Sequence, residues 1–193
     1  MGGDQRLINM ASGNQNVTRF LWAVVLFLSL VKLGQSLFLG TPFDGPNHDP
    51  QSDGDRFSIQ TGSFAILLER FDVHMRNVTA TVQVWTRTGF PPYTNPGDFV
   101  KRWEGNITGL GQGVATPMPA FNFPVPSNRT LGVYVTSKTQ YGKHMFHSNG
   151  TLVNKVFAND TYISICEGSS AEYYHALYKV PTKWNGEWSI HLR

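Results

Sequence analysis

The sequence contains a single cysteine, Cys166, in 193 residues, so no disulfide can form within one chain. Small secreted domains often depend on disulfides for stability. This chain must instead be stabilised by burial of apolar surface, and residues 37–193 have the length of one ordinary domain. Cys166 lies in the alternating stretch YISICEG, which predicts a buried, unreactive side chain.

The sequence also lacks a large excess of charge of either sign. The full chain carries 16 basic and 13 acidic residues, a formal charge of +3. Residues 1–36 contain three of the basic and one of the acidic residues. Residues 37–193 therefore carry 13 basic and 12 acidic residues, a formal charge close to +1. Because no basic cluster is left to neutralise phosphates, we expect no nucleic-acid partner.

No apolar run in the sequence reaches the roughly 20 residues of a membrane-spanning helix. The longest, FLWAVVLFLSLV at residues 20–31, has about 12. Arg6 and Arg19 precede it, and Lys32 and the small residues Gly34 and Ser36 follow it. This layout predicts a secretory signal peptide over residues 1–36, cleaved after Ser36, and a secreted or cell-surface protein without a membrane span. An uncleaved signal anchor is the alternative.

Acceptor sites for N-linked glycans, by contrast, are abundant. Chance predicts about two Asn-X-Ser/Thr motifs in a chain of this composition. Five follow residue 36, and a sixth at Asn16 precedes the apolar run. A glycan is bulky and hydrophilic, so each occupied site must lie on the surface. The predicted glycosylation sites are Asn77, Asn106, Asn128, Asn149 and Asn159.

Helical periodicity is hard to find after Ser36, whereas short stretches with a period of two recur between clusters of Gly, Pro and Asn. This pattern predicts an all-β fold: one antiparallel, jelly-roll-like β-sandwich of seven to nine strands over residues 56–193. Residues 37–55, rich in Gly, Pro, Asn and Asp, are expected to form an irregular lead-in. The predicted core is Ile66, Leu68, Val82, Val84, Val133, Val135, Ile163, Ile165, Trp188 and Ile190.

The order of several motifs resembles a known module. FDVH is followed by VQVWTRTG, then Trp103, GLGQGVATPMPAFNFPVP, LGVYVTS and a closing KWNGEWSIHL. Together they resemble a module of secreted and cell-surface proteins of diatoms and related stramenopile algae, with bacterial counterparts. The resemblance covers residues 54–192. It implies a jelly-roll-like β-sandwich outside the cell and supplies no catalytic residues.

Sequence signatures of catalysis are absent. The chain has neither GxSxG nor HExxH, and GLGQG at residues 109–113 lacks the following helix that a phosphate-binding loop needs. We therefore expect no enzyme. A secreted enzyme that acts on polysaccharide, with an acidic pair such as Glu167 and Glu172, remains the alternative.

Two kinds of ligand site can be weighed against ordinary structural roles. The lead-in offers oxygen ligands for calcium at Asp44, Asn47, Asp49, Asp53 and Asp55, but their spacing is not that of an EF-hand. Acidic and amide residues of this kind also simply form turns, and we expect no cofactor. We expect no transition-metal site either, because His144 and His147 would lie on opposite faces of a strand.

Aromatic residues are the third candidate. Sugars present C–H faces that pack against aromatic rings, and Trp and Tyr add a polar group. The candidate ligand-binding residues are Trp85, Tyr93 and Trp103. The sequence thus favours a non-catalytic, N-glycosylated module of the cell surface or extracellular matrix that binds an extracellular glycan or a cell-surface protein. A purely structural coat component is a further alternative.

Overall fold

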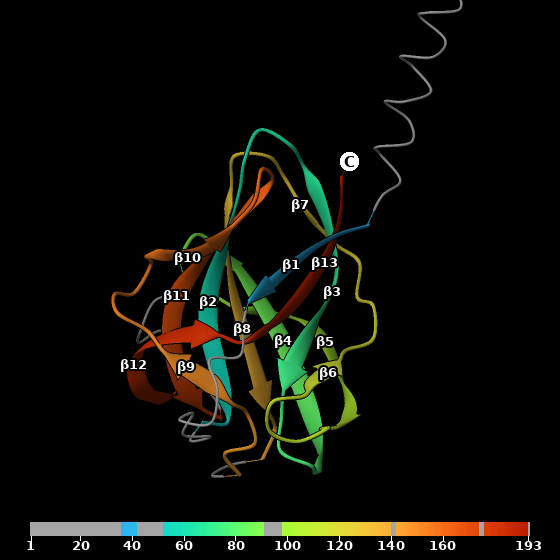
Figure 1. Ribbon diagram of the computed structural model, residues 1–193, viewed down its shortest axis with the longest axis vertical. Helices are drawn as coiled ribbons and strands as arrows, with labels where there is room; N and C mark the ends of the chain where they lie inside the picture. Colours follow the sequence, from blue (N-terminus) through green and yellow to red (C-terminus); the bar gives the residue numbers. More distant parts are fainter. Residues whose placement is uncertain (1–35, 42–51, 91–97, 140–141, 174–175, 193) are drawn as a thin grey trace, which may run out of the picture. The chain divides into compact units, whose positions relative to one another are not determined.

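The computed structural model describes residues 36–41, 52–90, 98–139, 142–173 and 176–192 (Figure 1). Within these ranges the chain forms thirteen β-strands and no helix. The predicted signal peptide lies almost wholly outside the described residues. Ser36, the predicted cleavage position, is the first residue of strand β1.

The smaller sheet has five strands, and they lie in the order β1-β13-β3-β6, with β7 also paired to β3. Pairing of β1 with β13 joins the start of the described chain to its end. The strands are β1 (Ser36–Thr41), β3 (Ile66–His74), β6 (Ala115–Pro117), β7 (Phe123–Val125) and β13 (Gly186–Leu192).

The larger sheet has eight strands in the order β5-β4-β8-β2-β11-β12-β9, with β10 paired to β11. The strands are β2 (Gly54–Thr61), β4 (Thr79–Thr88), β5 (Val100–Thr108), β8 (Thr130–Ser137), β9 (His147–Asn149), β10 (Val156–Asn159), β11 (Ile163–Glu172) and β12 (Ala176–Trp184).

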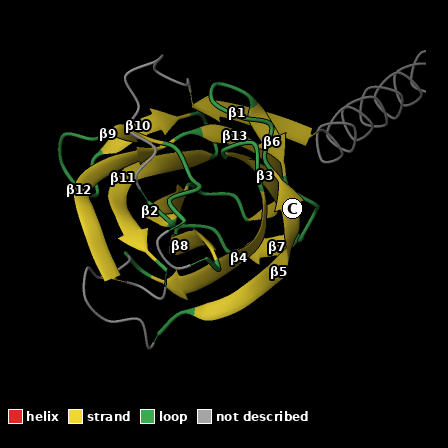
Figure 2. Ribbon diagram, turned by 90° about the horizontal axis from the view of Figure 1, so that it is seen from below, coloured by secondary structure: helices red, strands yellow, loops and turns green. Residues whose placement is uncertain are grey.

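The two sheets pack against each other, and the chain passes repeatedly from one to the other (Figures 1 and 2). The predicted all-β sandwich is therefore confirmed. The predicted strand number was too low, because β6, β9 and β10 have only three or four residues, too few for alternation to be recognised. Part of the expected irregular lead-in, residues 37–41, belongs to β1.

All ten residues of the predicted core are buried, each no more than 2 % exposed. Aromatic rings join the two sheets at the centre. The Trp188 ring of β13 lies 5.1 Å from that of Phe57 in β2 and 4.8 Å from that of Phe71 in β3, centroid to centroid. Trp184 of β12 contacts Phe57 at 4.9 Å. Cys166 is fully buried, as predicted, and burial raises the pKa of its thiol.

Replacing Trp188 with alanine should remove a central ring of the contact between the two sheets. We expect the free energy of unfolding to fall by about 3–5 kcal/mol, the usual loss for a buried Trp. This is a large part of the stability of an ordinary domain. Urea denaturation measures the change. Leu152→Ala is the control, since Leu152 is 65 % exposed and its truncation should change stability by less than about 0.5 kcal/mol. Equal losses of stability in the two variants would contradict the role of Trp188 in the contact between the sheets.

Candidate functional site

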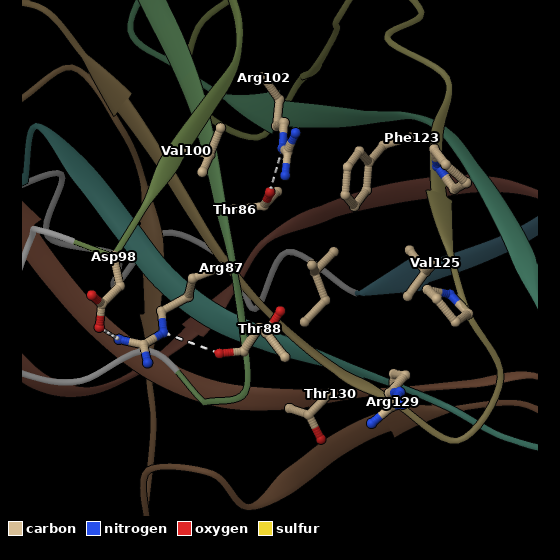
Figure 3. Close-up of a pocket in the computed structure, with 13 residues that line it drawn as sticks. Thr86, Arg87, Thr88, Asp98, Val100, Arg102, Phe123, Val125, Arg129 and Thr130 are labelled. Atoms are coloured by element: carbon tan, nitrogen blue, oxygen red, sulfur yellow. Dashed lines mark hydrogen bonds and ion pairs between the residues drawn. The ribbon is translucent and has the colours of Figure 1, made fainter.

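A pocket of about 520 Å³ opens between the two sheets, where the β4–β5 edge of the larger sheet faces β7 of the smaller one. We call it the β5–β7 pocket. Its size falls within the range of small-molecule sites. Figure 3 shows its residues, with Arg102 and Phe123 at one end and Arg129 at the other. The lining is Thr86, Arg87, Thr88, Asp98, Val100, Arg102, Phe123, Pro124, Val125, Pro126, Arg129, Thr130 and Leu131.

Strand register explains why Arg102 and Phe123 face each other. Phe123 pairs with the buried Leu68, so its side chain points toward the interior of the sandwich. Arg102 lies opposite, at an irregularity in the β4–β5 pairing. Its Nε donates a hydrogen bond to the Thr86 hydroxyl at 2.7 Å, and its guanidinium carbon lies 4.6 Å from the Phe123 ring centroid. Two contacts therefore hold the guanidinium in place.

The turn between β7 and β8 positions Arg129 at the other end of the pocket. Asn128 adopts a left-handed conformation at φ 52°, which asparagine tolerates better than most residues. The Arg129 amide donates to the Thr61 hydroxyl at 3.0 Å, and the Thr61 amide donates to the Arg129 carbonyl at 2.9 Å. These bonds attach the turn to the end of β2. The Arg129 side chain is exposed.

The third arginine of the pocket has an acidic partner. Arg87 lies 3.3 Å from an Asp98 carboxylate oxygen and donates from Nε to the Thr88 carbonyl at 3.2 Å. Its guanidinium carbon also lies 6.0 Å from the Phe99 ring centroid. Arg87 is thus partly neutralised by Asp98, and Asp98 is the only carboxylate among the described residues that line the pocket.

The aromatic residues predicted to bind ligand do not form one site. Val84 pairs with Trp103 and the next residue, Trp85, pairs with Lys101, so the two tryptophans lie on opposite faces of the sheet. Trp103 covers Gly105, where a Cβ would lie 2.6 Å from the ring carbon Cζ2. Tyr93 lies outside the described residues.

Trp85 packs against a second buried cluster on the outer face of the larger sheet, formed by Phe99, Tyr134 and Ala171. Its indole N–H donates to Gln83 at 3.2 Å, and the Lys101 ammonium lies 5.7 Å from the ring centroid. Trp85 is therefore half-buried as part of a small outer cluster. Its role in ligand binding stays a prediction.

Next to Trp85 lies a network of charges on the sheet surface. Glu104 accepts hydrogen bonds from Lys101, from Gln83 at 2.9 Å and from Lys138 at 3.3 Å. These donors, Lys101 first, lower the pKa of Glu104 to about 2. A carboxylate with three donors in place remains ionised at all physiological pH values and is not suited to proton transfer.

Two buried carboxylates anchor loops. Both Asp53 oxygens accept backbone amides, from Lys143 at 2.7 Å and from Tyr173 at 3.0 Å. Glu167 accepts hydrogen bonds from the amides of Thr151 and Leu152, the latter at 2.7 Å.

Of the possible calcium ligands, Asp44, Asn47 and Asp49 lie outside the described residues. Within the described ranges no group of three or more His, Cys, Asp or Glu side chains could hold a metal ion.

Asp55 is a third buried carboxylate, and it lies inside the sandwich. Thr182 donates its hydroxyl hydrogen to Oδ1 at 2.7 Å, whereas Oδ2 has no hydrogen-bond partner among the described residues. Burial raises the pKa of Asp55 from 3.8 to about 7, although the Thr182 hydrogen bond and the neighbouring Arg56 act in the opposite direction. The protonated form is therefore populated near neutral pH.

Ser189, Glu69 and His191 also lie together, on the smaller sheet. Ser189 and His191 both contact the same Glu69 oxygen, at 2.7 and 2.9 Å. In a catalytic triad the serine donates to the histidine, which the acid orients. Here the serine donates to the acid, so the arrangement does not activate a nucleophile.

All five predicted glycosylation sites have exposed asparagines. Asn77 lies between β3 and β4, and Asn128 between β7 and β8. Asn106, Asn149 and Asn159 lie in β5, β9 and β10, which each pair with only one strand in the described part of the chain. Occupancy of these sites stays a prediction.

Sequence reasoning missed the pocket residues Thr86, Arg102, Phe123 and Arg129. Arg102 and Phe123 lie in different sheets, so their facing arrangement depends on the pairing of β5 with β4, on the pairing of β7 with β3 and on the packing of the two sheets, which no local sequence pattern reveals. The only local signal was a basic residue beside an aromatic one in a predicted strand. Such a pair is common on ordinary surfaces and is therefore a weak predictor.

Asp55 generates a prediction about pH. Because the folded chain binds a proton at Asp55 more tightly than the unfolded chain, the unfolding free energy should fall as pH rises from about 4 to about 7. Each unit of difference in the pKa of Asp55 between the folded and the unfolded chain corresponds to about 1.4 kcal/mol of unfolding free energy. Asp55→Asn keeps the acceptor for Thr182 and removes the titration. The unfolding free energy of the variant, relative to that of the wild type, should therefore increase across that range. Urea denaturation at pH 4.5 and 8 tests this; identical pH dependence in the two proteins would contradict it.

The described residues include no helix long and apolar enough to cross a membrane. No protein-family model matches this chain, and the search of curated proteins also finds no match. The resemblance to the algal module therefore stays a prediction from the order of the motifs, and the function has to be argued from the geometry of the β5–β7 pocket.

Proposed function

We propose that this chain is a secreted, N-glycosylated β-sandwich module of the cell surface or extracellular matrix that binds glycan in the β5–β7 pocket without catalysing a reaction. The observation that carries this proposal is the fixed Arg102 guanidinium beside Phe123, in a pocket of about 520 Å³. Threonine hydroxyls and arginines offer hydrogen bonds to sugar hydroxyls, and Phe123 offers an apolar wall.

A concave site of this size favours a small ligand over a protein surface. Standard protein interfaces bury about 800 Å² on each partner and are not built around one such pocket. Arg102 is exposed, but its hydrogen bond to Thr86 and its contact with the Phe123 ring already restrict the side chain, which reduces the entropy lost when a ligand binds. These two features favour glycan over protein as the partner.

The alternative of a polysaccharide-active enzyme has less support. Glycoside hydrolysis generally needs two carboxyl groups on opposite sides of the scissile bond. Asp98 is the only one among the described pocket residues, and it pairs with Arg87. Glu167, one member of the suggested acidic pair, is buried and holds a turn. A structural coat component remains as the result expected if no glycan binds.

A glycan array on the folded protein, followed by titration of the best ligand, tests the proposal. Phe123→Ala should weaken that ligand by about tenfold or more, because the ring forms the pocket wall and orients Arg102. Trp85→Ala should lower the unfolding free energy by about 2 kcal/mol, as expected for a half-buried ring, and leave the affinity unchanged. The opposite result, with affinity lost only in Trp85→Ala, would move the site to the outer face. An array without any ligand would favour the structural coat component.

Glycans at the strand edges fit the same proposal. An unpaired strand edge can associate with the edge of another molecule, and proteins commonly block such edges. Asn106 and Asn149 lie on the two outermost strands of the larger sheet, as far as the structure describes it. The Asn106 side-chain oxygen accepts a hydrogen bond from Thr81 at 2.8 Å, which leaves its nitrogen for attachment of a sugar.

Expression through a eukaryotic secretory pathway tests this part. We expect a mature chain that begins at Leu37 and loses mass on enzymatic deglycosylation. Asn106→Gln and Asn149→Gln should each remove one glycan, and the double variant should self-associate more, as measured by light scattering. Asn77→Gln is the control, because Asn77 lies in a turn. A retained Met1 with no mass change on deglycosylation would overturn the proposal of secretion and glycosylation.

A further inference from the structure

The β5–β7 pocket contains more positive than negative charge. Three arginines and one aspartate line it, and the aspartate already pairs with Arg87. Neither Arg102 nor Arg129 forms an ion pair with any described residue. Since residues 37–193 carry 13 basic against 12 acidic residues, this excess is a local property of the pocket. It cannot be explained by a generally basic surface.

The placement of Arg102 determines which of its atoms can reach a ligand. Nε is occupied by the Thr86 hydroxyl, and one face of the guanidinium lies against Phe123. The two terminal nitrogens are left for a ligand in the pocket. They lie in one plane and match the two oxygens of a carboxylate or sulfate group. A neutral hydroxyl would use only part of this donor set.

The opposite end of the pocket adds a second cation. The Arg129 backbone is held by Thr61, and its side chain is exposed. The pocket is also lined by Thr88 and Thr130, which carry hydroxyls, and by the apolar residues Val125 and Leu131. Hydroxyl donors and acceptors beside an apolar wall suit a sugar ring, and the flanking cations suit a charged substituent on it.

Resting on the glycan-binding function proposed above, we propose that the β5–β7 pocket selects saccharides that carry a carboxylate or sulfate group, and that Arg102 and Arg129 bind this anion. The ligand class is therefore an acidic glycan, such as a uronate-containing or sulfated polysaccharide. The Arg102 guanidinium supplies the fixed, two-pronged contact, and Arg129 supplies attraction from the exposed turn.

Calorimetric titration of the secreted protein with three oligosaccharides of matched length tests this proposal. The probes are an oligogalacturonate, a sulfated oligogalactan and a neutral oligogalactan. We expect at least one acidic probe to bind about tenfold or more tightly than the neutral one, with an affinity that falls as salt is raised. Binding of the oligogalacturonate alone identifies a carboxylate as the anion, and binding of the sulfated probe alone identifies a sulfate.

Three pocket variants and one control variant locate the anion. Arg102→Gln and Arg129→Gln should each weaken the acidic probe by about tenfold or more and leave the neutral probe unchanged. Lys155→Gln removes a positive charge from the loop between β9 and β10 and is the matched control, expected to bind as the wild type does. Arg102→Lys keeps the charge but not the planar fork, and it should lose part of the affinity. Denaturation midpoints confirm that each variant is folded.

Failure of this inference differs from failure of the proposed function. If the neutral probe binds as tightly as the acidic ones, and Arg102→Gln and Arg129→Gln bind normally, the selection of anions is wrong while the glycan-binding function stands. If acidic probes bind but Lys155→Gln weakens them as much as the pocket variants do, the attraction is a general surface effect and the site is wrong. If no saccharide binds to the wild type, the proposed function fails and this inference fails with it.

Discussion

The packing of Trp188 between Phe57 and Phe71 is the contact on which the two-sheet arrangement depends. Phe57 belongs to the larger sheet, and Phe71 and Trp188 belong to neighbouring strands of the smaller one. A chain without disulfides has to hold two sheets together mainly by apolar burial, and aromatic rings bury the most surface per residue. The indole N–H of Trp188 has no hydrogen-bond partner among the described residues, which offsets part of this gain.

Around this centre the sandwich is closed by polar contacts. Asp53 and Glu167 each accept backbone amides from loops, and the Thr61 hydroxyl bonds to the turn before β8. Buried carboxylates of this kind are stabilising only while every oxygen has a donor. Asp55 is the exception, with one oxygen unpartnered, and its raised pKa follows from that burial.

The β5–β7 pocket exists because the aromatic packing does not extend to every margin of the sandwich. At the β4–β5 edge the larger sheet faces β7, a strand of only three residues. Polar and charged side chains line the space there together with the apolar residues Phe123, Val125 and Leu131. This short strand leaves room for Arg102 and Arg129 to reach a ligand.

The sequence alone determined the all-β class, the two-layer sandwich and the core, because alternation over eight to ten residues identifies the inward face of β4, β8 and β11 without knowledge of their partners. It also marked five asparagines that the fold leaves exposed, because turn residues and edge residues are polar. Only the tertiary structure decided which strands are neighbours. Register placed Arg102 opposite Phe123 and Trp85 over an outer cluster, and long-range pairing of this kind is not encoded in any local pattern.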